Sequence, residues 1–396
     1  QQDSLSPTET IELGRNDRTF LATGLSSELS WSGKTGEVGH ELHLGARVHH
    51  DDALRRATAH GIVVTSGALA NDGLAERRTV DSVADVLAFS AWAQDTLAYR
   101  SLRATVGLRL EQTSSSATNV LANAAAVDGG GTALLPGVGL LWTPVEGLAL
   151  LAGIYRGFAP VAPGQPSTVR PEQSWNVDAG MRWTGRKTRA ELIGFAGLYD
   201  NLVGTCSSAT GCAASAVGDQ FNGGRAQVLG VEASAGGLVS LPARIKVPLS
   251  LALTLSRATF ETSFASTNPA WGTVKAGDEV PYIPSLQLSA RTGLRRGPLD
   301  ISIEGRYVAA MRDLPGTAAV GVGKDAAGND TAAGNDTAAG TDPIAQLDVA
   351  VAYSFGRFGN VFVQAQNLTG AMSVVSLRPF GARAGLPRLV VVGWRL

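Results

Sequence analysis

Hydrophobic and polar residues alternate with period two along most of the chain. In the segment WNVDAGMRW, residues 175–183, every second residue from Trp175 onward is apolar and those between are polar or small. Successive side chains of a β-strand point to opposite faces, so this pattern predicts a strand with one apolar and one polar face. The alternation recurs about fifteen times and helical periodicity is nearly absent. The predicted fold class is therefore all-β.

The connections between the predicted strands alternate strictly between short and long. Short turns are expected near residues 31–38, 99–101, 143–147, 184–187, 236–243, 294–298 and 356–359. Long connections are expected near residues 50–82, 112–132, 158–171, 201–224, 258–280, 310–343 and 369–387. Outer-membrane barrels have short periplasmic turns and longer extracellular loops, and the bilayer forces their sheets to close.

This alternation predicts a transmembrane antiparallel β-barrel whose apolar side chains face lipid and whose polar side chains face the lumen. The alternative is a soluble β-helix or sandwich, which buries its apolar face instead. The tryptophans that lie near predicted strand ends fit an aromatic girdle at the membrane boundary, although aromatic residues are only 6% of the chain: Trp31, Trp142, Trp183 and Trp394.

Strand parity indicates a part of a longer barrel. If long loops are outside, a first strand near residues 19–31 runs inward and the final strand, PRLVVVGWRL, ends inside, which gives an odd strand count. Bacterial single-chain barrels have even counts with both ends periplasmic. We therefore expect residues 1–18 to be the remnant of an extracellular loop and residues 19–396 to be the C-terminal part of a barrel. The alternative is an autonomous barrel of 14 or 16 strands.

Composition and cysteine content bear on nucleic-acid binding, disulfide formation and metal binding. The net charge of −1 gives no sign of nucleic-acid binding. Cys206 and Cys212 are expected to form a loop disulfide, because a glycine-containing hairpin can bring their side chains together; the alternative is two free thiols. Two thiols without a nearby histidine leave a tetrahedral metal site half filled.

No catalytic motif is present, so the sequence does not predict an enzyme and no cofactor or metal is expected. The HHDD run at residues 49–52 offers metal-ligating side chains, but a solvated loop start is the favoured explanation. The repeat AAGNDT within residues 326–342 is small, polar and glycine-rich, which is typical of a flexible loop. A calcium site there would use Asp325, Asp330 and Asp336.

Several motifs together resemble the C-terminal barrel of TonB-dependent receptors, specifically the ferric citrate and siderophore group. They are VGLRLE at 106–111, RGFAP at 156–160, RPEQSWNVDAG at 170–180, the cysteine loop with GDQFNGGRAQVLGVEAS at 218–234, QNLTG at 366–370 and the closing strand. The chain departs from the family pattern at Asp178, which stands for Glu, at Thr369, which stands for Phe, and at Leu396, which stands for a terminal aromatic residue.

The resemblance implies a 22-strand barrel around an N-terminal plug, of which this chain holds about fifteen strands without the plug or the TonB box. It also implies TonB-dependent uptake of a ferric chelate or a similar scarce nutrient across the outer membrane of a Gram-negative bacterium. The implied partners are outer-membrane lipid, the energy-transducing TonB complex and the chelate. The alternatives are a passive porin-like channel, a membrane-embedded hydrolase and an adhesive surface protein.

A ferric chelate of this kind is often anionic, and arginine suits carboxylates through two-point contacts. The expected ligand-binding residues are Arg156, Arg170, Gln220, Asn222, Arg225, Arg312 and Arg378. Tyr155 and Phe158 are candidates for aromatic contacts with the ligand or for the girdle.

Overall fold

The computed structural model describes residues 8–65, 67–207, 212, 216–266, 268–269, 271–317, 320, 323–324, 330–331, 340–377 and 382–396. The long strands are β1 (Thr8–Thr35), β2 (Val38–Thr65), β4 (Arg77–Tyr99), β5 (Leu102–Asn119), β6 (Val127–Val145), β7 (Leu148–Ala159), β8 (Glu172–Thr184), β9 (Thr188–Tyr199), β12 (Ala226–Leu241), β13 (Ile245–Phe260), β16 (Leu286–Arg296), β17 (Leu299–Val308), β20 (Ile344–Ser354), β21 (Asn360–Gln366) and β24 (Leu389–Arg395).

Short elements lie in the connections. They are β3 (Ala68–Asn71), β10 (Val203–Thr205), β11 (Gln220–Asn222), β14 (Phe264–Ala265), β15 (Thr273–Val274), β18 (Gly323–Lys324), β19 (Asp330–Thr331), β22 (Val374–Ser376), β23 (Arg383–Ala384) and the 3-10 turns η3 (Pro242–Arg244) and η4 (Gly356–Phe358). Among the described residues, no helix has the length and apolar character that a helical membrane span requires.

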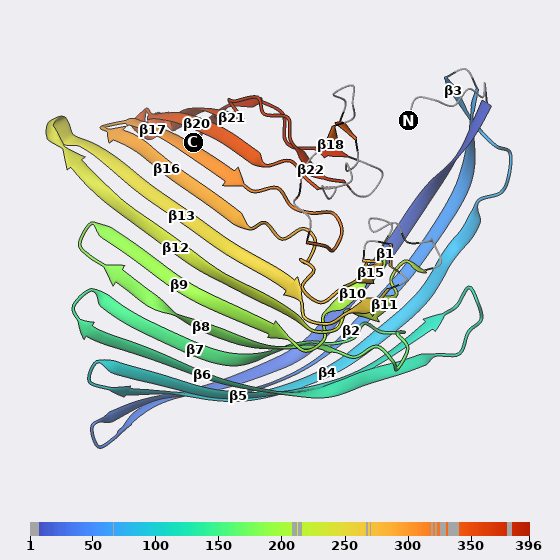
Figure 1. The fold of residues 1–396 in the computed structure, drawn as a ribbon, viewed down its shortest axis with the longest axis horizontal. Helices are drawn as coiled ribbons and strands as arrows, with labels where there is room; N and C mark the ends of the chain where they lie inside the picture. Colours follow the sequence, from blue (N-terminus) through green and yellow to red (C-terminus); the bar gives the residue numbers. More distant parts are fainter. Residues whose placement is uncertain are drawn as a thin grey trace.

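The long strands follow one another across a single antiparallel sheet in chain order, from β1 to β24. Fifteen strands of the described chain form this path, and β3 adds to the outer end of β2. Figure 1 shows the sheet bent into a trough, with β1 and the C-terminal strands on opposite rims. No pairing joins β1 to β24 within the described residues. The predicted all-β class, the antiparallel pairing and the strand number are confirmed.

Each strand divides its side chains between the two faces of the sheet as the alternation predicts. Directly paired residues lie on the same face, and one row runs from Val138 through Ile154 and Val177 to Ala196 and Leu229. The large apolar side chains of this row are about two-fifths exposed, because no described part of the chain covers them. Such a continuous exposed apolar face is typical of a sheet that faces lipid.

The opposite face, called the inner face below, carries the charged residues. Two of its ion pairs link neighbouring strands: Arg306 of β17 contacts Asp348 of β20 at 3.2 Å, and Arg295 of β16 contacts Asp300 of β17 at 2.8 Å. Arg306 also contacts Glu304 of its own strand at 2.7 Å. Charged side chains stay hydrated on a face that borders water, so exposed pairs like these add little stability.

The turn regions confirm the sorting of short and long connections. Gly36 and Gly297 adopt φ of +62° and +56° in short turns, a conformation that glycine reaches without steric cost. The four tryptophans predicted for a girdle lie on the apolar face at the short-turn end of β1, β6, β8 and β24 and are about half exposed. They occupy the position of one aromatic girdle.

The first strands are longer than the sequence pattern predicts. Strands β1 and β2 have 28 residues each and pair along their whole length, so the expectation of a loop over residues 1–18 is wrong for residues 8–18. The long connections expected at 50–82 and 112–132 are likewise mostly strand. A strand of this length spans roughly 90 Å, far beyond the bilayer. Outside lipid a strand needs no apolar face, so the alternation that marks the membrane part ends before the strand does.

Candidate functional site

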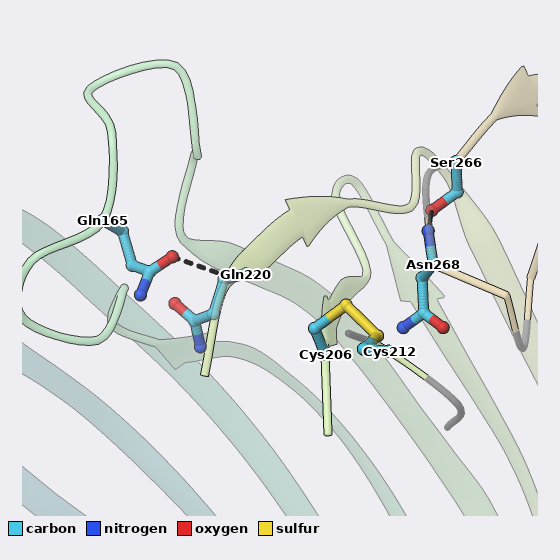
Figure 2. Close-up of a disulfide and its surroundings, with 6 residues drawn as sticks. All are labelled: Gln165, Cys206, Cys212, Gln220, Ser266 and Asn268. Carbon is cyan, nitrogen blue, oxygen red and sulfur yellow. Dashed lines mark hydrogen bonds between the residues drawn. A yellow bond between two sulfur atoms is a disulfide. The ribbon is translucent and has the colours of Figure 1, made fainter. Parts of the chain in front are cut away.

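The connections at the long-loop end fold over the inner face and are locked together by side-chain amides. Gln220 and Asn222 on β11 hold the segment 160–171: the Ala162 amide donates to Gln220 Oε1 at 2.8 Å, and the Arg170 amide donates to Asn222 Oδ1 at 2.9 Å. The Gln220 amide in turn donates to Gln165 Oε1 at 2.7 Å (Figure 2). A loop tied at both ends in this way keeps one position.

Asn201 stabilises the same junction from beneath. It is 1% exposed, and its Nδ2 donates to the Arg170 carbonyl at 2.9 Å and to Asn222 Oδ1 at 3.0 Å. The Val203 amide donates to Glu172 Oε2 at 3.1 Å, which joins β10 to the start of β8. Buried polar groups are normally paired in this manner, because an unpaired one is costly.

An aromatic cluster supports the loops on their other side. Phe260 is fully buried, and its ring centroid lies 5.3 Å from that of Trp271 and 5.6 Å from that of Phe264. Phe221 of β11 meets Trp271 edge to face at 4.8 Å. Edge-to-face aromatic pairs add stability beyond the area they bury. The cluster therefore joins β11 and β13 to the β14–β15 hairpin at the mouth of the trough.

Cys206 and Cys212 form a disulfide with Cα atoms 5.8 Å apart. Figure 2 shows it between Gln220 and the segment that holds Asn268. It closes a small loop directly after β10, so it holds the start of the connection that leads to the amide clamp of Gln220 and Asn222.

Beneath the clamped segment lies a cavity of about 420 Å³, called the mouth pocket below. Its floor is the inner face of β2, β4 and β5, where His49, Asp51 and Glu111 supply the titratable groups, and Phe158 and residues 160–163 line its other side. His49 Nε2 lies 3.5 Å from Asp51 Oδ2, and Ser90 Oγ donates to Glu111 Oε2 at 2.6 Å. Val86, Ala88 and Leu135 add apolar surface, and an apolar lining with a few polar groups is the usual composition of a small-molecule site.

A second polar group joins the later loops. Arg312 is 4% exposed and donates through Nε to Glu279 Oε2 at 2.9 Å, and the Tyr282 hydroxyl donates to Asp313 Oδ1 at 2.5 Å. Burial, with the hydrogen bond to Asp313 second, raises the pKa of Tyr282 above its ordinary value. These contacts connect the β13–β16 and β17–β20 connections.

The structure separates the residues that were expected to bind ligand. Arg156 lies opposite Trp175 on the apolar face and donates to Gln173, so its expected role in the lumen is wrong. Arg312 is buried in its ion pair with Glu279 and is wrong for the same role, since a ligand cannot reach it.

Gln220 and Asn222 meet the clamped loop instead of an open cavity. Arg225 is exposed just before β12, next to the buried Ala226, and Arg170 is exposed on the clamped segment. Arg378 lies outside the described residues. Tyr155 faces inward opposite Gly137, and Phe158 lines the mouth pocket.

The floor of the mouth pocket was not predicted as a ligand site. The sequence marked His49 and Asp51 only as possible metal ligands, and among the described residues no group of three or more His, Cys, Asp or Glu side chains is arranged to hold a metal ion. Because side chains alternate between the two faces of a strand, both residues lie on the inner face, and this alternation could be read from the sequence.

Comparison with known proteins identifies the family to which this fold belongs. The model of a family described as "TonB dependent receptor-like, beta-barrel" matches residues 2–368. No curated protein sequence matches the chain.

Similar solved structures include the ferric citrate transporter FecA in its unliganded form, with a TM-score of 0.73 and 17% identity over 96% of this chain and 55% of that one. The siderophore receptor PiuA from Acinetobacter baumannii gives 0.70 and 12% over 95% and 56%, and the ferric-catecholate import receptor Fiu from E. coli in its closed form gives 0.65 and 16% over 95% and 54%. The chain thus spans about half the length of these proteins. Since the family model covers most of its residues, the chain belongs to the TonB-dependent receptor-like β-barrel family.

Proposed function

We propose that this chain forms the outer-membrane wall of a transporter that takes up a ferric chelate, ferric citrate or a siderophore, with energy from the TonB complex. The observation that carries the proposal is the mouth pocket, a cavity on the inner face of a receptor-family sheet roofed by a clamped loop. The names of the similar structures, a ferric citrate transporter and siderophore receptors, support the same class of ligand. The proposed work is binding and transport, with no catalytic role.

The ligand enters from the long-loop side and meets the mouth pocket first. Arg170, exposed on the clamped segment, supplies a positive charge for the carboxylates of the chelate, and the amides of Gln220 and Asn222 keep that segment in place. Preorganisation of a binding loop lowers the entropy cost of binding. Arg378 stays in the proposal on the sequence argument alone. The exposed apolar face contacts outer-membrane lipid of a Gram-negative cell.

The test uses the complete gene in its own host. A deletion strain is supplied with the wild-type gene or with variants, and iron uptake is measured with ferric citrate or a siderophore as the sole iron source. We expect uptake to need the gene and to stop when a protonophore removes the energy source. Arg170→Gln and Asn222→Ala should raise the concentration for half-maximal uptake, while the matched control Arg156→Gln should not.

Two results contradict the proposal. Iron uptake that is unchanged by the deletion removes the transport function altogether. Solute entry that persists in a strain without TonB, together with steady ion conductance in planar bilayers, assigns the protein to passive channels instead.

A further inference from the structure

The inner face carries a second charged cavity at the opposite, short-turn end. This cavity, about 460 Å³, is lined by residues of β9, β12, β13, β16 and β17, among them Arg189, Gly236, Ser250 and Arg291. The pairing registers place these four residues in one row across the sheet: Arg189 lies opposite Gly236, Gly236 opposite Ser250, and Ser250 opposite Arg291. Two arginines therefore stand on either side of a saddle made of a glycine and a serine.

Both arginines line the cavity above this saddle. Three strand intervals separate the Arg189 and Arg291 backbones, which is roughly 14 Å. The Arg189 side chain leans over the saddle, since a Cβ added to Gly236 would lie 3.0 Å from Arg189 Nε. Glycine at position 236 thus leaves the room that Arg189 occupies on the way toward Arg291.

Positive charge is in excess around the saddle, because Lys187, Arg189, Arg291 and Arg295 line the cavity together with a single carboxylate among its lining residues, Asp300. Two arginines of nearby rows have acidic partners, since Arg295 contacts Asp300 at 2.8 Å and Arg182 contacts Glu191. Glu304, which lies opposite Arg291, contacts Arg306 instead at 2.7 Å. In the described part of the chain, neither Arg189 nor Arg291 has a carboxylate within ion-pair distance. Lys187 adds a further positive charge to the rim of the cavity.

We propose that this cavity, called the lower arginine site below, binds a small anion that carries two or more carboxylates. Each guanidinium offers a planar fork of N–H donors that fits one carboxylate through two hydrogen bonds, so two forks on opposite sides of a saddle bind two carboxylates of one molecule. The Ser250 hydroxyl adds a neutral donor between them. The site deepens the proposed function, because it gives an anionic chelate a second binding position near the end where transport finishes.

Binding of iron-free citrate to the full chain in detergent micelles tests the inference. Isothermal titration calorimetry at low ionic strength should detect binding to the wild type, with acetate much weaker because it engages one fork only. Arg189→Gln and Arg291→Gln should each weaken citrate binding by about 10-fold or more, since each removes charge-assisted hydrogen bonds. Arg103→Gln, which removes an inner-face arginine from β5, should leave the affinity within twofold of the wild type.

A variant that keeps both arginines shows whether weaker binding reflects the site itself and not misfolding. Gly236→Val retains every charge but occupies the space of the Arg189 side chain, so it should also weaken citrate binding while circular dichroism and heat-modifiable gel mobility stay as in the wild type. Absence of citrate binding, or equal affinity in wild type, Arg189→Gln and Arg291→Gln, overturns the inference. These outcomes are independent of the proposed function, because they need neither iron nor the TonB complex; failure of iron uptake in the cell leaves citrate binding to the lower arginine site measurable.

Discussion

Gly45 on β2 lies directly opposite Trp92 on β4, and the indole ring of Trp92 covers the space where a Gly45 side chain would stand. On its other side the ring receives the Arg109 guanidinium, whose Cζ lies 4.9 Å from the ring centroid. Arg109 is held by Glu111, whose second oxygen accepts from Ser90. The absence of a side chain at Gly45 thus allows the cation–π contact between Arg109 and Trp92 beneath the mouth pocket.

Replacement of Gly45 by leucine should destabilise the sheet. Any side chain at position 45 overlaps the Trp92 ring, so the ring must leave its place beside Arg109. We expect a loss of about 1–3 kcal/mol, the usual cost of overpacking. Urea unfolding in lipid vesicles, followed by tryptophan fluorescence, measures it. The control is Gly107→Ala on β5, where the nearest atom to an added Cβ is 3.7 Å away. Equal midpoints for both variants would contradict the packing argument.

The orientation of the faces can be tested with two neighbouring residues of β13. Leu251 belongs to the apolar face, in register with Ala235 and Ala290, whereas Ala252 belongs to the inner face, in register with Ser234 and Ser289. Arginine at position 251 should cost roughly 2–4 kcal/mol if that position lies near the bilayer midplane, since its charge enters hydrocarbon.

Arginine at position 252 should cost far less, because the inner face borders water. The fraction of each variant that reaches the heat-modifiable, membrane-inserted form, together with its urea midpoint, provides the comparison. A larger loss for Ala252→Arg than for Leu251→Arg would mean that the assignment of lipid and lumen faces is inverted.

The fold could be predicted from the sequence because contact with lipid on one face requires an apolar side chain at every second residue. Leu249 and Leu251 alternate with Ser250 and Ala252 because one face contacts acyl chains, and the alternation alone indicates which residues share a face. The same rule failed for β1 and β2 where these strands leave the membrane, since polar runs such as HHDD remain in extended pairing there.

The site was less predictable because side-chain roles depend on loop folding. Gln220 and Asn222 were expected to touch ligand on the strength of their polarity, yet they accept hydrogen bonds from a loop more than 50 residues away in the chain. Arg156 was assigned to the lumen because arginine suits carboxylates, although its pairing with Trp175 places it on the apolar face.

Asn367 offers a prediction about the last long connection. It adopts φ of +49° and is 2% exposed, and its Nδ2 donates to the carbonyls of Ala371 and Leu386, both at 2.9 Å. Asn367→Ala should cost about 1–3 kcal/mol, because two carbonyls lose the donor that the buried Asn367 side chain supplies and alanine tolerates the left-handed region poorly.

Asn367→Gly should cost less, since glycine removes the backbone strain but not the lost hydrogen bonds. Hydrogen exchange of residues 368–377 and 382–386 measures the local effect, with exchange of β9 as the internal reference. If Asn367→Ala and Asn367→Gly open this connection to the same extent, backbone conformation has no part in the role of Asn367.

The hydrogen bond from Tyr282 to Asp313 predicts a dependence on alkaline pH. Burial raises the pKa of Tyr282 above the ordinary value of 10.0, and the hydrogen bond that its neutral hydroxyl donates to Asp313 acts in the same direction. A group whose pKa is raised by folding contributes stability that is complete below the unfolded pKa and is lost as pH rises through the folded one. The connection between β13 and β16 should therefore weaken only above about pH 10.

Tyr282→Phe removes both the hydroxyl and its titration. This variant should be less stable than the wild type at pH 8, by about 1.5–3 kcal/mol for a hydrogen bond to a charged acceptor. As the pH rises past 10 the wild type should lose stability faster, so that the two urea midpoints approach each other. Parallel profiles between pH 8 and 11.5 would show that the Tyr282 hydroxyl does not hold the loops together.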